Sequence, residues 1–68
     1  MELKIALIDQ QNNSYLFERG QLIINGQNKG KGRLLTPLHK LCLRRPAIFT
    51  ANGVKLKTYP LKGCMVDN

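Results

Sequence analysis

The sequence is poor in the side chains from which catalytic sites are built. Its 68 residues include no Trp, one His, two Cys and four Asp or Glu. The one serine, Ser14, lies in a polar stretch without the glycines that flank a nucleophile elbow, so a triad of Ser, His and Asp lacks its nucleophile. A chain of this length also leaves little volume for a substrate cleft. These absences predict a protein that is not an enzyme.

Residues that bind metal ions are also few. His39 and Cys42 form one pair, and Cys64 and Asp67 form another, which together are a possible zinc set. Neither pair has the Cys-x2-Cys form that is typical of structural zinc sites. A disulfide between Cys42 and Cys64 is a second alternative, which the reducing cytosol disfavours. We expect no metal and no cofactor, and structural roles for all four residues.

Long apolar runs are missing as well. No stretch approaches the roughly 18 consecutive apolar residues that a membrane-spanning helix needs. In residues 1–9 the apolar run is too short, and an acidic residue follows too early, for a secretory signal. The sequence therefore predicts a cytoplasmic protein without a membrane partner. At this length we expect one small basic domain over residues 1–68, which buries about 60% of the surface of the unfolded chain.

Acidic residues are absent from the middle of the chain. Residues 19–66 hold ten Lys and Arg and no Asp or Glu, and the whole chain carries a formal charge of +7. A segment of one sign repels itself, and a polyanion that neutralises the segment offsets that cost. Nucleic acid is the most abundant such partner. The alternative is that the charge only keeps a small protein soluble and monomeric.

Alternating apolar and polar residues predict several short strands. Ile5 and Leu7 share one face of the first strand, and similar alternation recurs along the chain. Asn-Gly pairs at 25–26 and 52–53 are typical of type I′ turns, and the second pair predicts a hairpin. We expect strands over residues 2–9, 14–18, 21–25, 47–51 and 54–59, with a short further strand over 64–66.

One helix is also expected. Thr36 is a good N-cap, Pro37 suits the first helical position, and the helix must end before Pro46. Arg44 and Arg45 would then complement the dipole at its C-terminal end. The expected fold is mainly β or small α+β, a bent antiparallel sheet or small barrel of four to five short strands with one two-turn helix.

Glycines and cations alternate after the first Asn-Gly pair. The stretch from Gly26 to Lys31 reads G-x-x-x-G-K, one residue too short for a P-loop, and Gly32 stands where that motif needs Ser or Thr. We expect instead a flexible basic loop whose Lys29, Lys31 and Arg33 side chains contact an anion. The alternative is a mobile hairpin loop that lysine keeps soluble.

A row of cations is expected in the strand over residues 54–59. Alternation places Lys55, Lys57 and Tyr59 on one face, as in a surface that binds a phosphate backbone and stacks one ring. The alternative is an edge strand that charge protects from pairing. The candidate binding residues are Lys29, Lys31, Arg33, Arg44, Arg45, Lys55, Lys57 and Tyr59.

These observations favour a small basic binding protein that contacts nucleic-acid phosphates, of either DNA or RNA. The alternative is an inhibitor or adaptor of the phage or plasmid type, which binds an acidic or nucleic-acid-binding surface of a host complex for defence or transcription. Such an inhibitor should ignore free nucleic acid at moderate salt. A subunit of a larger assembly is a third possibility, and the chain is expected to be a monomer or a homodimer.

Overall fold

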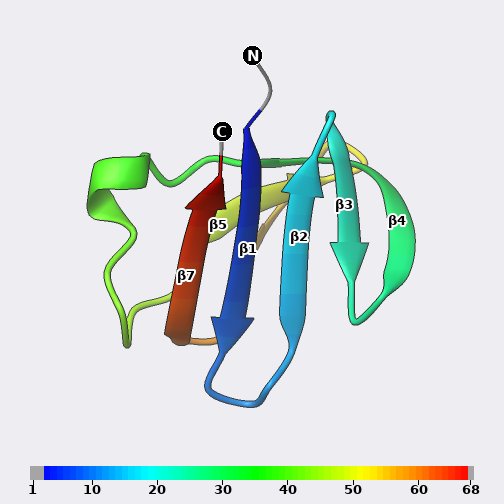
Figure 1. The fold of residues 1–68 in the computed structure, drawn as a ribbon. Helices are drawn as coiled ribbons and strands as arrows, with labels where there is room; N and C mark the ends of the chain where they lie inside the picture. Colours follow the sequence, from blue (N-terminus) through cyan, green and yellow to red (C-terminus); the bar gives the residue numbers. More distant parts are fainter. Residues whose placement is uncertain (1–2, 68) are drawn as a thin grey trace.

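Antiparallel strands make up most of the structure. The computed structural model describes residues 3–67. One sheet holds seven strands in the order β6-β5-β4-β3-β2-β1-β7, so that β7 returns to the free side of β1 (Figure 1). The expectation of a mainly β fold is confirmed, but four to five strands are too few. The elements are β1 (Lys4–Asp9), β2 (Ser14–Glu18), β3 (Gln21–Ile24), β4 (Gln27–Leu34), η1 (Leu38–Lys40), β5 (Ile48–Ala51), β6 (Val54–Lys57) and β7 (Leu61–Asp67).

The sheet folds over on itself at β4. The first part of this strand pairs with β3 through Gln27, Asn28 and Lys31, and its last part pairs with β5 through residues 32–34. Figure 1 shows β1, β2 and β7 in one layer and β5 lying behind them. The inner faces of the two layers meet, and their outer faces point in opposite directions.

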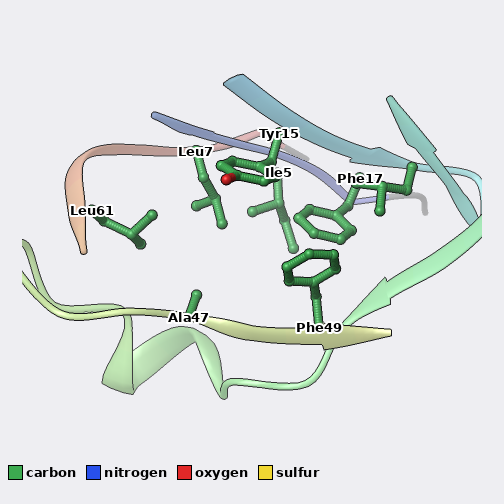
Figure 2. Packing of buried hydrophobic residues seen from close by; sticks show 8 residues of the cluster. Ile5, Leu7, Tyr15, Phe17, Ala47, Phe49 and Leu61 are labelled. Atoms are coloured by element: carbon green, nitrogen blue, oxygen red, sulfur yellow. The ribbon is translucent and has the colours of Figure 1, made fainter. Parts of the chain in front are cut away.

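The core lies between these two layers. Phe49 projects from β5 towards β1 and β2 (Figure 2), and its ring centroid lies 5.8 Å from that of Tyr15 and 5.9 Å from that of Phe17. Tilted and edge-on ring contacts of this kind are favoured by the aromatic quadrupoles. Ile5 and Leu7 point inward as their alternation predicts. The buried apolar cluster consists of Ile5, Leu7, Tyr15, Phe17, Leu22, Ala47, Phe49 and Leu61.

A buried carboxylate closes the turn between β1 and β2. Asp9 has 0% of its surface exposed. Its Oδ1 accepts hydrogen bonds from the backbone N–H groups of Gln11 and Asn13 at 2.8 and 2.9 Å. Its Oδ2 accepts from the Tyr15 hydroxyl at 2.7 Å and from Asn13 Nδ2 at 3.1 Å. Burial opposes ionisation, but these hydrogen bonds outweigh it and hold the pKa of Asp9 below its usual value.

The segment expected as a flexible basic loop is instead β4, a strand of eight residues. Its glycines have a packing role. A Cβ atom on Gly32 would lie 2.4 Å from the Cβ atom of Leu22 and 3.0 Å from the carbonyl oxygen of Thr50. Gly30 has a φ of 91°, which favours glycine. The loop interpretation was wrong because these glycines admit neighbouring side chains and strands instead of providing flexibility.

The expected two-turn helix is replaced by the single 3-10 turn η1. Thr36 does not cap it, because its Oγ1 accepts the backbone N–H of Ile48 at 2.7 Å. Farther along the chain, the backbone N–H of Arg44 donates to the carbonyl oxygen of Leu61. The backbone N–H of Leu61 in turn donates to the carbonyl oxygen of Arg45 at 3.0 Å. Two helical turns are marginal by themselves, and these bonds to other parts of the sheet take their place. The two arginines therefore do not lie at a helix end.

Both Asn-Gly turns form as expected. Asn25 and Asn52 each have a φ of 51°, and Gly26 and Gly53 have φ values of 81° and 82°. A type I′ turn needs these positive values at both central positions. The further strand expected over residues 64–66 also exists, and β7 extends beyond it on both sides.

Candidate anion-binding surface

A row of side chains crosses the outer face of β4, β5 and β6. Arg33 lies opposite Thr50, and Thr50 lies opposite Lys55. Directly opposed residues of antiparallel strands share a face, with Cβ atoms about 5 Å apart. Gly32, which precedes Arg33, and Phe49, which precedes Thr50, are buried on the core side. Because successive side chains of a strand point to opposite faces, Arg33 and Thr50 face solvent. Two cations therefore flank one hydroxyl group.

Two further lysines extend this row. Lys57 lies opposite Ile48, two residues along β6, and Lys31 lies opposite Gln21 of β3. The charged side chains of the group are all exposed. Phe49 projects from β5 towards β1 and β2 (Figure 2), so the residues that alternate with it along the strands lie on the opposite side of this layer. We call the following residues the basic face: Lys31, Arg33, Thr50, Lys55 and Lys57.

A shallow hollow of about 380 Å³ opens beside the row. Its lining carries the three cations Arg19, Lys31 and Arg33, the amide of Gln21 and the hydroxyl of Thr50, and none of its described residues is acidic. Glycines from β4 and from two turns complete the lining, so part of its wall is bare backbone. Charged and neutral hydrogen-bond donors around such a hollow suit a phosphate group.

Lys29 lies apart from the basic face. The register between β3 and β4 shifts between Gln21 and Ile23, which breaks the alternation that would align Lys29 with Lys31. The Nζ atom of Lys29 donates to Oε1 of Gln27 at 3.2 Å. Of the three cations that the sequence assigns to this segment, the last two share the face.

Arg44 and Arg45 belong to another part of the surface. They follow η1 and join the beginning of β7 through the backbone of Leu61. Arg44 lines a second hollow there, together with Lys62. The sequence groups these arginines with the cations of the basic face, and the structure does not bring them together.

Tyr59 is not part of the row either. β6 ends at Lys57, so the alternation expected over residues 54–59 does not reach the tyrosine. The next residue, Pro60, accepts the backbone N–H of Gln10 at 2.8 Å, which places this segment beside the turn between β1 and β2. The side chain of Tyr59 is 52% exposed there, away from Lys55.

The carboxylates of the described residues lie away from the row. Asp9 is buried, and Glu18 and Asp67 lie opposite Lys4 from its two sides, on the outer face of β2, β1 and β7. Glu18 also precedes Arg19 of the hollow. The charge is therefore divided between the layers, with cations alone on one outer face and mixed charges on the other.

Sequence reasoning missed three residues of this surface: Arg19, Gln21 and Thr50. A signal was present for Thr50, because a two-residue Asn-Gly turn sets the register of its hairpin and so places Thr50 opposite Lys55. For the other two, the Asn25-Gly26 turn sets the register only at Ile24 and Ile23, and the shift between Ile23 and Gln21, which the sequence does not indicate, brings Lys31 opposite Gln21.

No three His, Cys, Asp or Glu side chains within residues 3–67 come close enough to hold a metal ion. Cys42 and Cys64 are free thiols and both are exposed. Over the same residues, no helix has the length and apolar character to cross a membrane.

The chain matches no protein-family model, no curated protein and no solved structure. The basic face and the hollow are the features from which a function can be inferred.

Proposed function

We propose that this chain is a non-enzymatic cytoplasmic binding module whose basic face holds the phosphate backbone of DNA or RNA. The observation that carries the proposal is the row of Arg33, Thr50 and Lys55 beside a hollow that other cations line. A guanidinium group donates two parallel N–H bonds to phosphate oxygens, and lysine adds a point charge. The Thr50 hydroxyl donates to the carbonyl oxygen of Arg33 at the long distance of 3.5 Å and can rotate to donate to a phosphate instead. These groups complement a phosphate in both charge and geometry.

The shape of the surface favours a polymer over a small ligand. The cations spread over three strands of an open sheet face, and the hollow beside them is shallow. A chain of phosphates can contact several of these cations together and release one counterion at each contact. Four contacts would make the logarithm of the affinity fall with the logarithm of the salt concentration at a slope of about −3 to −4.

Recognition at this surface should depend little on base sequence. No aromatic side chain belongs to the basic face among the residues described, so base stacking contributes little there. Lysine and arginine contacts to phosphates position a nucleic acid without reading its bases. We therefore expect similar affinities for unrelated sequences of the same strandedness.

The test compares two triple variants that lose the same charge. Lys31→Gln, Arg33→Gln and Lys55→Gln remove cations from the basic face, whereas Arg44→Gln, Arg45→Gln and Lys62→Gln remove three from the region near the beginning of β7. Fluorescence anisotropy with labelled duplex DNA, single-stranded DNA and RNA is measured across a salt series. The first variant should bind at least about tenfold more weakly, with a salt slope smaller in magnitude by about 2 to 3. The second should keep most of the affinity.

A single substitution separates binding from folding. Thr50→Glu places a carboxylate between Arg33 and Lys55, where it repels phosphate but pairs with both cations. Opposite charges across strands contribute about 0.2–1 kcal/mol, so the melting temperature should hold while binding is lost. Equal loss in both triple variants would contradict a defined face. No binding by the unmodified chain at about 100 mM salt would instead favour the alternative of an adaptor or inhibitor that binds an acidic protein.

A further inference from the structure

The two ends of the sheet are protected to different degrees. Strands at a sheet edge expose unpaired backbone groups, which short length and lysine side chains normally keep from pairing with another chain. β6 has both protections, with only four residues that include Lys55 and Lys57, and its two apolar residues, Val54 and Leu56, are 57% and 44% exposed. β7 has seven residues, and its exposed side chains include Met65 at 69% and Val66 at 42%.

Part of the β7 edge is already covered. The N–H and carbonyl groups of Leu61 pair with Arg45 and Arg44 on the side away from β1. Within residues 3–67, no backbone group outside the sheet pairs in this way with residues 63–67. The strand therefore has a closed beginning and an open remainder.

An apolar row on the outer face ends at this open edge. Ile23, Leu16, Ala6 and Met65 lie opposite one another in turn across β3, β2, β1 and β7. Three of the four are covered in part by their neighbours, whereas Met65 at the end of the row is the most exposed of the large apolar side chains within residues 3–67. A further strand beside β7 would cover it and continue the row.

We propose that two copies of this chain form a dimer by pairing residues 63–67 of their β7 strands, antiparallel about a two-fold axis at Met65. Gly63 then lies opposite Asp67 of the second copy, and Cys64 lies opposite Val66. In this register, residues whose side chains lie on the outer face of the sheet pair with residues of the same kind, as the alternation of a strand requires. It joins the two sheets and brings the two Met65 side chains into contact.

The covered part of the edge selects this register. Pairing centred on Cys64 would place Asp67 of the second copy opposite Leu61, whose backbone N–H and carbonyl groups already pair with Arg45 and Arg44. Pairing centred on Val66 would use fewer of the open residues. The register about Met65 uses the whole open segment and no more.

Charge also favours a second copy as the partner. In the proposed register Asp67 of one copy lies opposite Gly63 of the other, next to Lys62. Glu18 and Asp67 lie beside Lys4 on the outer face of this layer. The antiparallel register brings this end of each copy towards the beginning of β7 of the other copy, where Arg44, Arg45 and Lys62 lie. The basic faces stay on the other layer and remain accessible.

The test uses the position that the axis places opposite itself. Met65→Lys and Met65→Glu each set two like charges directly opposite one another, so each variant alone should be monomeric. An equal mixture of the two sets opposite charges there and should recover the dimer. Sedimentation equilibrium at about 0.3 M salt, which screens the net charge, should give twice the 7.7 kDa chain mass for the unmodified chain and for the mixture.

Two controls keep the outcome unambiguous. Val54→Lys on the edge of β6 should leave the dimer intact, and circular dichroism should show that every variant is folded. In a Cys42→Ser background, Val66→Cys should form a covalent dimer with Cys64 of the second copy on mild oxidation. The proposal is overturned if the unmodified chain is monomeric at chain concentrations up to about 0.5 mM, or if the mixture stays monomeric. No nucleic acid is present, so the result is independent of the basic face.

Discussion

Asp9 shows how one side chain organises a turn. Its two oxygens accept four hydrogen bonds, which come from the next residues of the chain and from the hydroxyl of Tyr15. Burial, together with the hydrogen bond to Asp9, raises the pKa of Tyr15, so the hydroxyl remains a donor. The pair links the turn to the aromatic core. One of the four acidic residues of the chain is thus the polar centre of this end of the molecule.

The stability of the protein should depend on pH through Asp9. Because the pKa of Asp9 is lower in the folded chain than its usual value of 3.8, the carboxylate stabilises the fold above that value. This contribution is lost as the pH falls through the lower, folded pKa. Asp9→Asn should lower the free energy of unfolding by about 2 kcal/mol at pH 7. Urea unfolding from about pH 7 to pH 2.5 should show the variant and the unmodified chain converging in acid.

A matched change at an exposed carboxylate provides the control. Asp67→Asn should lower the free energy of unfolding at pH 7 much less than Asp9→Asn does, because Asp67 is exposed. If Asp9→Asn ran parallel to the unmodified chain over the whole range, another group would be responsible for the acid sensitivity.

At the scale of elements, β4 is the strand on which the fold depends most. It pairs with β3 and β5 and carries the sheet from one layer to the other. Gly32 lies at this corner, against Leu22, which is fully buried at 0% exposure. The close approach leaves no room for a side chain.

Gly32→Ala should therefore destabilise the protein. The added Cβ atom would lie 2.4 Å from that of Leu22, and relief requires a shift of backbone as well as side chains. We expect the free energy of unfolding to fall by about 2–3 kcal/mol. Gly63→Ala is the matched control, because its nearest neighbour would be the Cβ atom of Ile8 at 3.8 Å, an ordinary contact. Similar melting temperatures for the two variants would show that the β4 corner is not tightly packed.

Elements with local causes were predictable from the sequence, and those with distant causes were not. Asn52 and Gly53 carry their turn signal within two residues, so the last hairpin and its register follow from the sequence. Gly32 was expected in a loop because the sequence does not show that Leu22 packs against it. Thr36 and the residues after it have helix signals, but Thr36 accepts a hydrogen bond from Ile48, and Arg44 and Arg45 pair with Leu61 farther along the chain.

The candidate surface divides in the same way. The alternation of Lys55 and Lys57 is local, and the structure places both on one outer face. Arg33 joins them because β4 pairs with β5. This pairing was not predicted, because the segment that contains Arg33 was expected to be a loop. Arg44 shares only its charge with this group, and charge along a sequence does not show where a side chain lies in space.

At the scale of the whole molecule, cations outnumber carboxylates and repel one another. Residues 19–66 carry a charge of +10 and the other residues carry −3, which gives the formal charge of +7. Such repulsion destabilises the folded chain and is screened by salt. Charge therefore affects folding and binding in opposite directions.

Salt should raise the melting temperature while it weakens nucleic-acid binding. Between about 20 mM and 300 mM NaCl the screening length shortens several-fold, so the unmodified chain should melt at a higher temperature. Differential scanning fluorimetry with an external dye measures the shift. The variant Lys31→Gln, Arg33→Gln and Lys55→Gln should show a smaller shift, because less repulsion remains. A melting temperature that falls with salt would mean that attractive charge pairs dominate the fold.

The order of the strands also limits how far the sheet can grow. In the proposed dimer, β7 closes one end by pairing with a copy of itself, and both ends of the joined sheet are β6 strands. Those ends are short and carry lysines, so no further copy can add. The addition of further copies, which would form a polymer, therefore stops at the dimer. In that dimer the same chain supplies both the strand that begins assembly and the residues that end it.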